Sequence, residues 1–82
     1  GNACGITDGA CALIVTTAAR ARELGLKPLA RLRSFAWAGC DPARMGLGPV
    51  YASRLALARA GCALSDMQVI ELYEAFAVQV LA

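Results

Sequence analysis

A strand-like run that changes into a helix-like run near the end of the chain constrains the fold most strongly. Residues 69–72 include two β-branched side chains, whereas residues 75–82 are mostly small and apolar. Glu71, Glu74 and the phenol of Tyr73 lie where the pattern changes. A strand that leads into a helix brings side chains and free backbone N–H groups to one point, where α/β folds place ligands. The alternative interpretation is a buried strand entering a packed helix, with acids that are solvated or cap the helix.

The preceding residues alternate between strand-like and helix-like runs, which predicts an α/β fold. Residues 10–15 are small or β-branched and apolar, which is typical of a parallel strand buried on both faces. Side chains in residues 29–38 change in character from one residue to the next, and Phe35 and Trp37 fall on the same side of the segment. This period of two, together with the aromatic residues, predicts a half-buried or antiparallel strand.

The first helix is expected over residues 18–24. Thr16 or Thr17 would cap its first turn through a side-chain oxygen. Gly25 would end it, because glycine adopts the left-handed conformation that follows many helices.

A long irregular loop and a second helix are expected in the middle of the chain. Residues 39–49 contain three glycines and two prolines, and loops of this length are often functional. The helix is expected from residue 50 to about residue 60, with Gly61 after it. Ser65 and Gln68 have the spacing of a capping box at the turn that follows.

Composition indicates that the chain packs against other protein surfaces. Of its 82 residues, 59% are hydrophobic, and the mean hydropathy is +0.55. A chain of this length buries only about 60% of its unfolded surface when folded alone. We therefore expect a fragment of a larger protein, with apolar faces that meet neighbours.

Charge and hydropathy argue against several other classes of protein. The net charge of +2 comes from 8 basic and 6 acidic residues, which is too weak a balance to indicate nucleic-acid binding. No apolar run approaches the roughly 20 residues that cross a bilayer. No basic segment followed by a long apolar segment marks a signal peptide.

Four cysteines and the lack of histidine limit the chemistry of the chain. No pair has the C-x-x-C spacing of zinc or thioredoxin sites, and no metal site is expected. Two disulfides are possible, but the α/β pattern favours reduced thiols, at least three of them in buried packing positions. A Cys-His or Ser-His nucleophilic site cannot form within this chain alone. The cysteines are Cys4, Cys11, Cys40 and Cys62.

Three runs, in the same order along the chain, resemble motifs of the thiolase family. Residues 71–77 are similar to its Asn-Glu-Ala-Phe or His-Glu-Ala-Phe motif, with Tyr73 at the variable position. Residues 1–10 resemble its Gly-Asn-Ala-Ser-Gly-Ile-Asn-Asp-Gly-Ala run. Residues 39–49 resemble its Gly-Val-Asp-Pro…Met-Gly-x-Gly-Pro loop. The resemblance therefore covers essentially the whole chain.

The resemblance implies an α/β fragment that joins two halves of a thiolase-like fold. The expected order is β-α-β-loop-α-β-α, part of a five-stranded βαβαβαββ layer. Residues 1–26 would end the N-terminal domain with a loop, its last strand and a helix. Residues 27–82 would begin the C-terminal domain.

The resemblance also implies an activity for the parent protein. Thiolases (acetyl-CoA C-acyltransferases, or 3-ketoacyl-CoA thiolases) transfer an acyl group between 3-oxoacyl-CoA and coenzyme A. Coenzyme A would be a substrate, and no covalently bound cofactor is expected. The family's nucleophilic cysteine lies upstream of the matched region, and its Gly-His-Pro histidine and second cysteine lie downstream. The alternative is a non-catalytic thiolase-fold protein that binds acyl-CoA or serves as a scaffold, or an inactive fragment.

The matched motifs suggest roles for five residues in binding and catalysis. Tyr73 stands where the family has an Asn or His that helps form the oxyanion site, and losing such a donor costs on the order of 100-fold in rate. Cys4 stands where a serine contacts the pantetheine arm of coenzyme A, and a thiol is a weaker hydrogen-bonding group. Met45 would line the acyl or pantetheine tunnel, or simply fill a gap. Ala75 and Phe76 would border the coenzyme A channel.

Two further residues are expected to be structural. Glu74 would order its turn through hydrogen bonds, and Asp8 precedes a glycine, as in many turns.

By resemblance, the partners would be acyl-CoA, the rest of the subunit and a second copy in a homodimer or homotetramer. A hydratase–dehydrogenase subunit is a further candidate partner. The expected compartment is the bacterial cytoplasm, with mitochondria or peroxisomes as alternatives.

Overall fold

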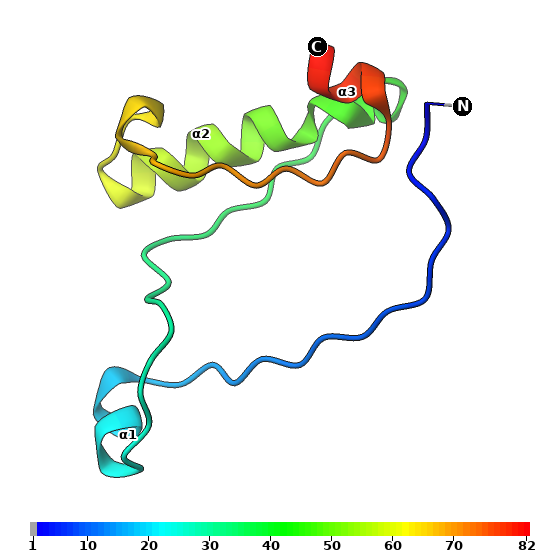
Figure 1. The fold of residues 1–82 in the computed structure, drawn as a ribbon. Helices are drawn as coiled ribbons and strands as arrows, with labels where there is room; N and C mark the ends of the chain where they lie inside the picture. Colours follow the sequence, from blue (N-terminus) through cyan, green and yellow to red (C-terminus); the bar gives the residue numbers. More distant parts are fainter. Residues whose placement is uncertain (1) are drawn as a thin grey trace.

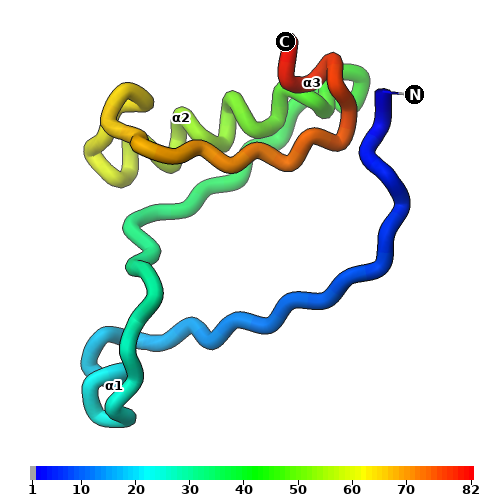
Figure 2. The backbone as a smooth tube through the Cα atoms, in the orientation of Figure 1, coloured from blue at the N-terminus to red at the C-terminus, as the bar shows by residue number. Residues whose placement is uncertain are grey.

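The computed structural model describes residues 2–82, and Figure 1 shows an open arrangement of short helices joined by extended segments. From a start beside α3, the chain runs to α1 at the far end and returns to α2, whose first turns lie near α3 (Figure 2). The helical elements are α1 (Ala18–Glu23), the 3₁₀ segment η1 (Pro42–Leu47), α2 (Gly48–Ala60), the 3₁₀ turn η2 (Leu64–Asp66) and α3 (Ala77–Leu81).

Helix α1 begins and ends where the sequence predicts. The Thr17 side chain accepts a hydrogen bond from the Arg20 backbone N–H at 3.2 Å, which satisfies a free donor of the first turn. Gly25 has a φ of +63° just past the helix. Arg20 and Glu23 form an exposed ion pair at 2.9 Å. The predicted cap and stop of this helix are therefore confirmed.

Helix α2 packs against the extended segment 33–40. Ser34 and every second residue after it in this segment are half-buried, whereas Phe35 and Trp37 on the other side are exposed. The rings of Phe35 and Trp37 lie 5.3 Å apart. The predicted period of two is therefore confirmed, with the aromatic side facing away from α2. Gly61 ends the helix with a φ of +65°, as predicted.

The three predicted strands do not form among residues 2–82. The described backbone contains a single isolated antiparallel bridge, between Ala3 and Phe76. A strand needs a neighbour to satisfy its N–H and C=O groups, and residues 10–15 have no such neighbour here. Ile14, for example, is 86% exposed. The prediction of paired strands is therefore wrong for this chain by itself.

The connections on either side of α2 also differ from expectation. Residues 39–49 are not irregular throughout, because η1 forms directly after Asp41. The Asp41 carboxylate accepts a hydrogen bond from the Ala43 N–H at 2.9 Å and caps this segment. The capping box predicted for Ser65 and Gln68 is wrong: the Asp66 carboxylate accepts from the Ala63 N–H at 2.8 Å instead.

Residues 2–82 enclose almost no hydrophobic core. Ala21, at 5% exposure, is the sole buried hydrophobic residue in the described part. The radius of gyration is 16.3 Å, whereas a compact domain of this length has about 12 Å. The expectation of buried cysteines is wrong here, since Cys4 and Cys11 are exposed while Cys40 and Cys62 are half-buried and all are free thiols. Across the described residues, no helix is both long and apolar enough to span a membrane.

Candidate functional site

A shallow surface hollow lies where the N-terminal segment meets the residues that lead into α3. It is open to solvent and has a volume of about 530 Å³. The chain therefore brings its two ends together at the place where the strand-like run was predicted to change into a helix. The lining residues are Asn2, Ala3, Cys4, Leu72, Tyr73, Glu74 and Ala77.

Two backbone hydrogen bonds hold the two ends of the chain together. The Cys4 N–H donates to the Ala75 carbonyl at 3.0 Å, and the Ala77 N–H donates to the Asn2 carbonyl at 2.8 Å. These bonds flank the isolated bridge and fix the register of the two segments. As a result, the side chains of residues 4 and 73 lie over the same hollow.

The Cys4 thiol and the Tyr73 hydroxyl are in direct contact, with 3.3 Å between sulfur and oxygen. Either atom can be the donor. The pKa of Tyr73 is raised above its ordinary value, first by this hydrogen bond, then by the charge that Cys4 can carry, and then by desolvation. The phenol therefore keeps its proton over a wide pH range and remains a hydrogen-bond donor. Tyr73 is 77% exposed and can reach a bound molecule.

The other residues predicted to act at the site lie at different distances from the hollow. Ala75 is half-buried, and Phe76, which forms the bridge with Ala3, is 43% exposed. Met45 lies in η1 and does not line the hollow, although the neighbouring Gly46 faces Gln79 of α3. The five residues predicted for binding and catalysis are therefore not all gathered at one place.

The two residues predicted to be structural form no side-chain hydrogen bond among residues 2–82. Glu74 lines the hollow and is exposed. Asp8 lies on the exposed N-terminal segment, away from the hollow. Their structural roles stay predictions. Gly1, which begins the first matched motif, lies outside the described residues.

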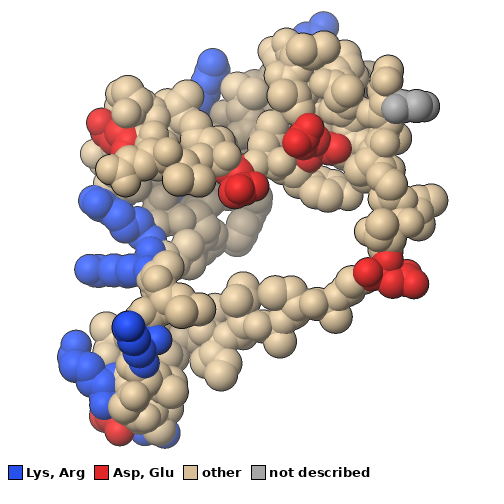
Figure 3. Space-filling model, in the orientation of Figure 1, with Lys and Arg blue, Asp and Glu red and all other residues tan. Residues whose placement is uncertain are grey.

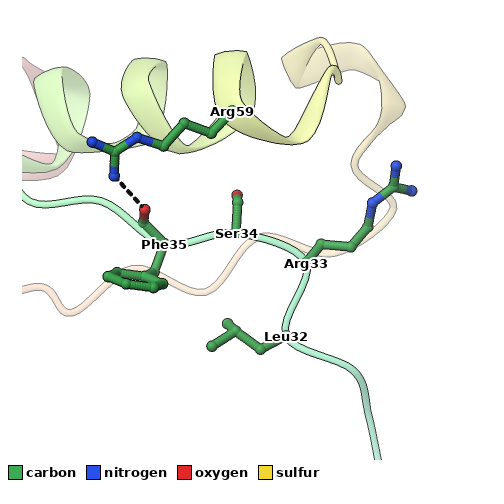
Figure 4. Close-up of a pocket in the computed structure, with 5 residues that line it drawn as sticks. All are labelled: Leu32, Arg33, Ser34, Phe35 and Arg59. Carbon is green, nitrogen blue, oxygen red and sulfur yellow. Dashed lines mark hydrogen bonds between the residues drawn. The ribbon is translucent and has the colours of Figure 1, made fainter. Parts of the chain in front are cut away.

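A second hollow, of about 330 Å³, lies between the segment around residue 34 and α2 (Figure 4). The Arg59 guanidinium donates to the Phe35 carbonyl at 2.8 Å, and the Arg33 guanidinium donates to the Ala60 carbonyl at 3.4 Å. Figure 4 shows these two guanidinium groups pointing away from each other, so they do not converge on a shared ligand. The sequence pattern did not predict these contacts. Ser34 lies on the half-buried side of the segment, opposite the exposed aromatic residues.

Charged groups are dispersed over the face of the molecule in Figure 3. Basic side chains gather mainly on the left of this view, around α1 and the adjoining segment, while acidic groups are scattered. No three His, Cys, Asp or Glu residues of the part that the structure describes are placed to hold a metal ion. The polar side chains that line the first hollow are the Tyr73 phenol, the Cys4 thiol, the Asn2 amide and the Glu74 carboxylate.

Comparison with known proteins identifies the class of protein to which this chain belongs. The family model described as "Thiolase, C-terminal domain" matches residues 26–82. The chain belongs to the thiolase family and carries part of a thiolase fold.

The individual relatives are bacterial proteins named 3-ketoacyl-CoA thiolase. Those of Salmonella typhimurium strain LT2, Escherichia fergusonii and Escherichia coli O1:K1 are each 57% identical to this chain over 81 residues. The matched region is 99% of this chain and 21% of each relative. The chain therefore spans about a fifth of the length of these relatives.

Proposed function

We propose that this chain is part of a thiolase subunit that transfers an acyl group between 3-oxoacyl-CoA and coenzyme A. The observation that carries the proposal is 57% identity, across 99% of the chain, to proteins named 3-ketoacyl-CoA thiolase. The hollow beside Tyr73 supports it, because a protonated phenol is a suitable hydrogen-bond donor for a thioester oxygen. The nucleophile and the general acid–base groups would come from the rest of the subunit.

Within this subunit, the hollow would form one wall of the coenzyme A site. The Tyr73 hydroxyl would donate a hydrogen bond to the thioester oxygen as negative charge develops on it. Cys4 and the adjoining backbone would lie along the pantetheine arm, with Ala75 and Phe76 bordering the channel. Met45 would contribute to the tunnel wall from η1. Glu74 and Asp8 would shape their turns.

The exposed apolar surface of the chain would be covered by the rest of the subunit. Trp37 at 79% exposure, Ile14 at 86% and Leu29 at 97% are too apolar to remain in water in the working protein. The N-terminal and C-terminal domains of the fold would meet near residue 26, and their missing strands would complete the five-stranded layers. We place the subunit in a homodimer or homotetramer in the bacterial cytoplasm, with a hydratase–dehydrogenase as a further partner.

The test is an assay of CoA-dependent cleavage of 3-oxoacyl-CoA by the full-length subunit that contains this chain. Wild-type protein should show CoA-dependent loss of the 3-oxoacyl thioester. The Tyr73→Phe variant should lose activity on the order of 100-fold, because a donor to the oxyanion is removed. Tyr51→Phe is the matched control, since it removes a phenol on α2, outside the hollow. Tight acyl-CoA binding without turnover by the wild type would instead favour a binding or scaffold protein.

A further inference from the structure

We infer that Cys4 is a positioning residue, which holds the Tyr73 phenol over the hollow so that its hydroxyl can donate to the thioester oxygen of a bound acyl-CoA. The inference rests on the proposed function and adds a second role for Cys4, which acts through Tyr73, to its place along the pantetheine arm. It follows from the geometry of the two side chains and of the backbone that carries them.

The backbone around Cys4 fixes where its thiol lies. The Cys4 N–H is bonded to the Ala75 carbonyl at 3.0 Å, two residues beyond Tyr73. This bond and the adjacent bridge prevent the N-terminal segment from sliding along the residues before α3. The thiol is therefore presented to residue 73 in one register.

The Tyr73 side chain has no other anchor in the described part of the chain. It is 77% exposed, and its hydroxyl makes one side-chain hydrogen bond, to the Cys4 sulfur at 3.3 Å. An exposed aromatic side chain otherwise exchanges between rotamers. A single contact that selects one rotamer has a large effect on a group that must meet a substrate atom within hydrogen-bonding distance.

The direction of the hydrogen bond suits this role. When the thiol donates to the phenol oxygen, the phenol proton is free to point into the hollow. When the phenol donates to sulfur, the weak bond is readily exchanged for a stronger one to a substrate oxygen. The raised pKa of Tyr73 corresponds to the second arrangement, in which the phenol donates to sulfur and keeps its proton.

The test is a double-mutant cycle in the full-length subunit, with kcat and KM measured for 3-oxoacyl-CoA cleavage. Cys4→Ala should lower kcat about three- to ten-fold with little change in KM, which is the range expected for one neutral hydrogen bond. The double variant Cys4→Ala with Tyr73→Phe should be no slower than Tyr73→Phe alone, because both changes remove the same function. Cys4→Ser should retain most of the activity, since a hydroxyl can make the same bond. Cys11→Ala is the matched control.

Two kinetic results would overturn the inference. One is a rise in KM without a fall in kcat for Cys4→Ala, which would mean that Cys4 acts only through its contact with coenzyme A. The other is additivity of the two losses in the double variant, which would mean that Cys4 does not act through Tyr73.

A spectroscopic measurement separates this inference from the proposed function. The ionisation of Tyr73 can be followed by phenolate absorbance, with Tyr73→Phe as the blank for all other tyrosines. The pKa of Tyr73 should fall in Cys4→Ala, whether or not the protein has thiolase activity. An unchanged pKa would overturn the inference. A pKa that falls in a protein without thiolase activity would leave the contact intact but remove its catalytic role, and so would overturn both proposals as stated.

Discussion

The Ser34 hydroxyl donates a 2.7 Å hydrogen bond to the backbone carbonyl of Ala56, in the middle of α2. This bond joins the segment that precedes η1 to the longest helix of the chain. It is half-buried, so water competes for it less than for the exposed contacts nearby.

Replacing Ser34 with alanine should therefore loosen the packing of this segment on α2. We expect Ser34→Ala to lower the free energy of unfolding by about 0.5–1.5 kcal/mol, the net value of a typical hydrogen bond. The measurement is urea unfolding of the full-length subunit. Ser53→Ala is the matched control, because Ser53 is exposed on α2 and makes no side-chain hydrogen bond within residues 2–82. Equal effects of the two substitutions would contradict this prediction.

Arg59 should contribute less than Ser34, although it makes a contact of similar length. Its guanidinium donates to the Phe35 carbonyl at 2.8 Å in an exposed setting, where water competes and side-chain entropy is lost. We expect Arg59→Ala to lower the free energy of unfolding by about 0.5 kcal/mol or less. Arg54→Ala is the control on the same helix. If Arg59→Ala lowers the free energy of unfolding more than Ser34→Ala does, the expected order is contradicted.

Local signals predicted the ends of the helices, because each depends on a few neighbouring residues. Thr17, Gly25 and Gly61 act within one turn of their own helix, and the structure places all three as expected. Asp41 before Pro42 also carries the signature of a helix start, and η1 begins there within the segment predicted to be irregular.

The strands and the site depend on residues far away in the sequence, so local patterns could not define them. Residues 10–15 have the composition of a buried strand, but no backbone segment within residues 2–82 pairs with them. The Cys4–Tyr73 contact joins opposite ends of the chain. Matched motifs indicated that both residues belong to one site, whereas no periodicity could show that the two side chains touch.

Gly61 gives a prediction that depends on backbone conformation alone. Its φ of +65° lies in the left-handed region, and an added Cβ would meet no atom within 4 Å. Gly61→Ala should therefore destabilise the subunit by about 1–2 kcal/mol through backbone strain, not through a clash. Gly39→Ala is the matched control, because it also meets no atom within 4 Å but does not have a φ in that region. If Gly61→Ala destabilises the subunit no more than Gly39→Ala does, α2 ends differently in the protein.

The 82-residue chain by itself should not unfold as a cooperative unit. A single buried hydrophobic residue, Ala21, cannot offset the conformational entropy lost when the described residues are ordered. We expect broad thermal unfolding without a defined transition, together with concentration-dependent association through the exposed apolar segments. Calorimetry and sedimentation of the isolated chain provide the measurement. A sharp transition from a monomer would contradict this prediction.

The raised pKa of Tyr73 predicts how the stability of the subunit changes at alkaline pH. The hydrogen bond with Cys4 is the main cause, followed by the charge on Cys4 and by desolvation, and each raises the pKa above its ordinary value of 10.0. Because the folded protein favours the protonated phenol, the stabilisation is fully present below about pH 10 and is lost as pH rises through the higher folded pKa.

The measurement is the difference in urea midpoint between wild type and Tyr73→Phe across this pH range. The difference should be constant below about pH 9. As pH rises further, the wild type should lose stability relative to Tyr73→Phe, because only the wild type has a phenol at residue 73 that can lose its proton. The effect should be small, since Tyr73 is exposed to water. Tyr51→Phe is the matched control, and Cys4→Ala should weaken the pH dependence. If the wild type and Tyr73→Phe keep the same difference throughout, the Cys4 contact does not hold the proton on Tyr73.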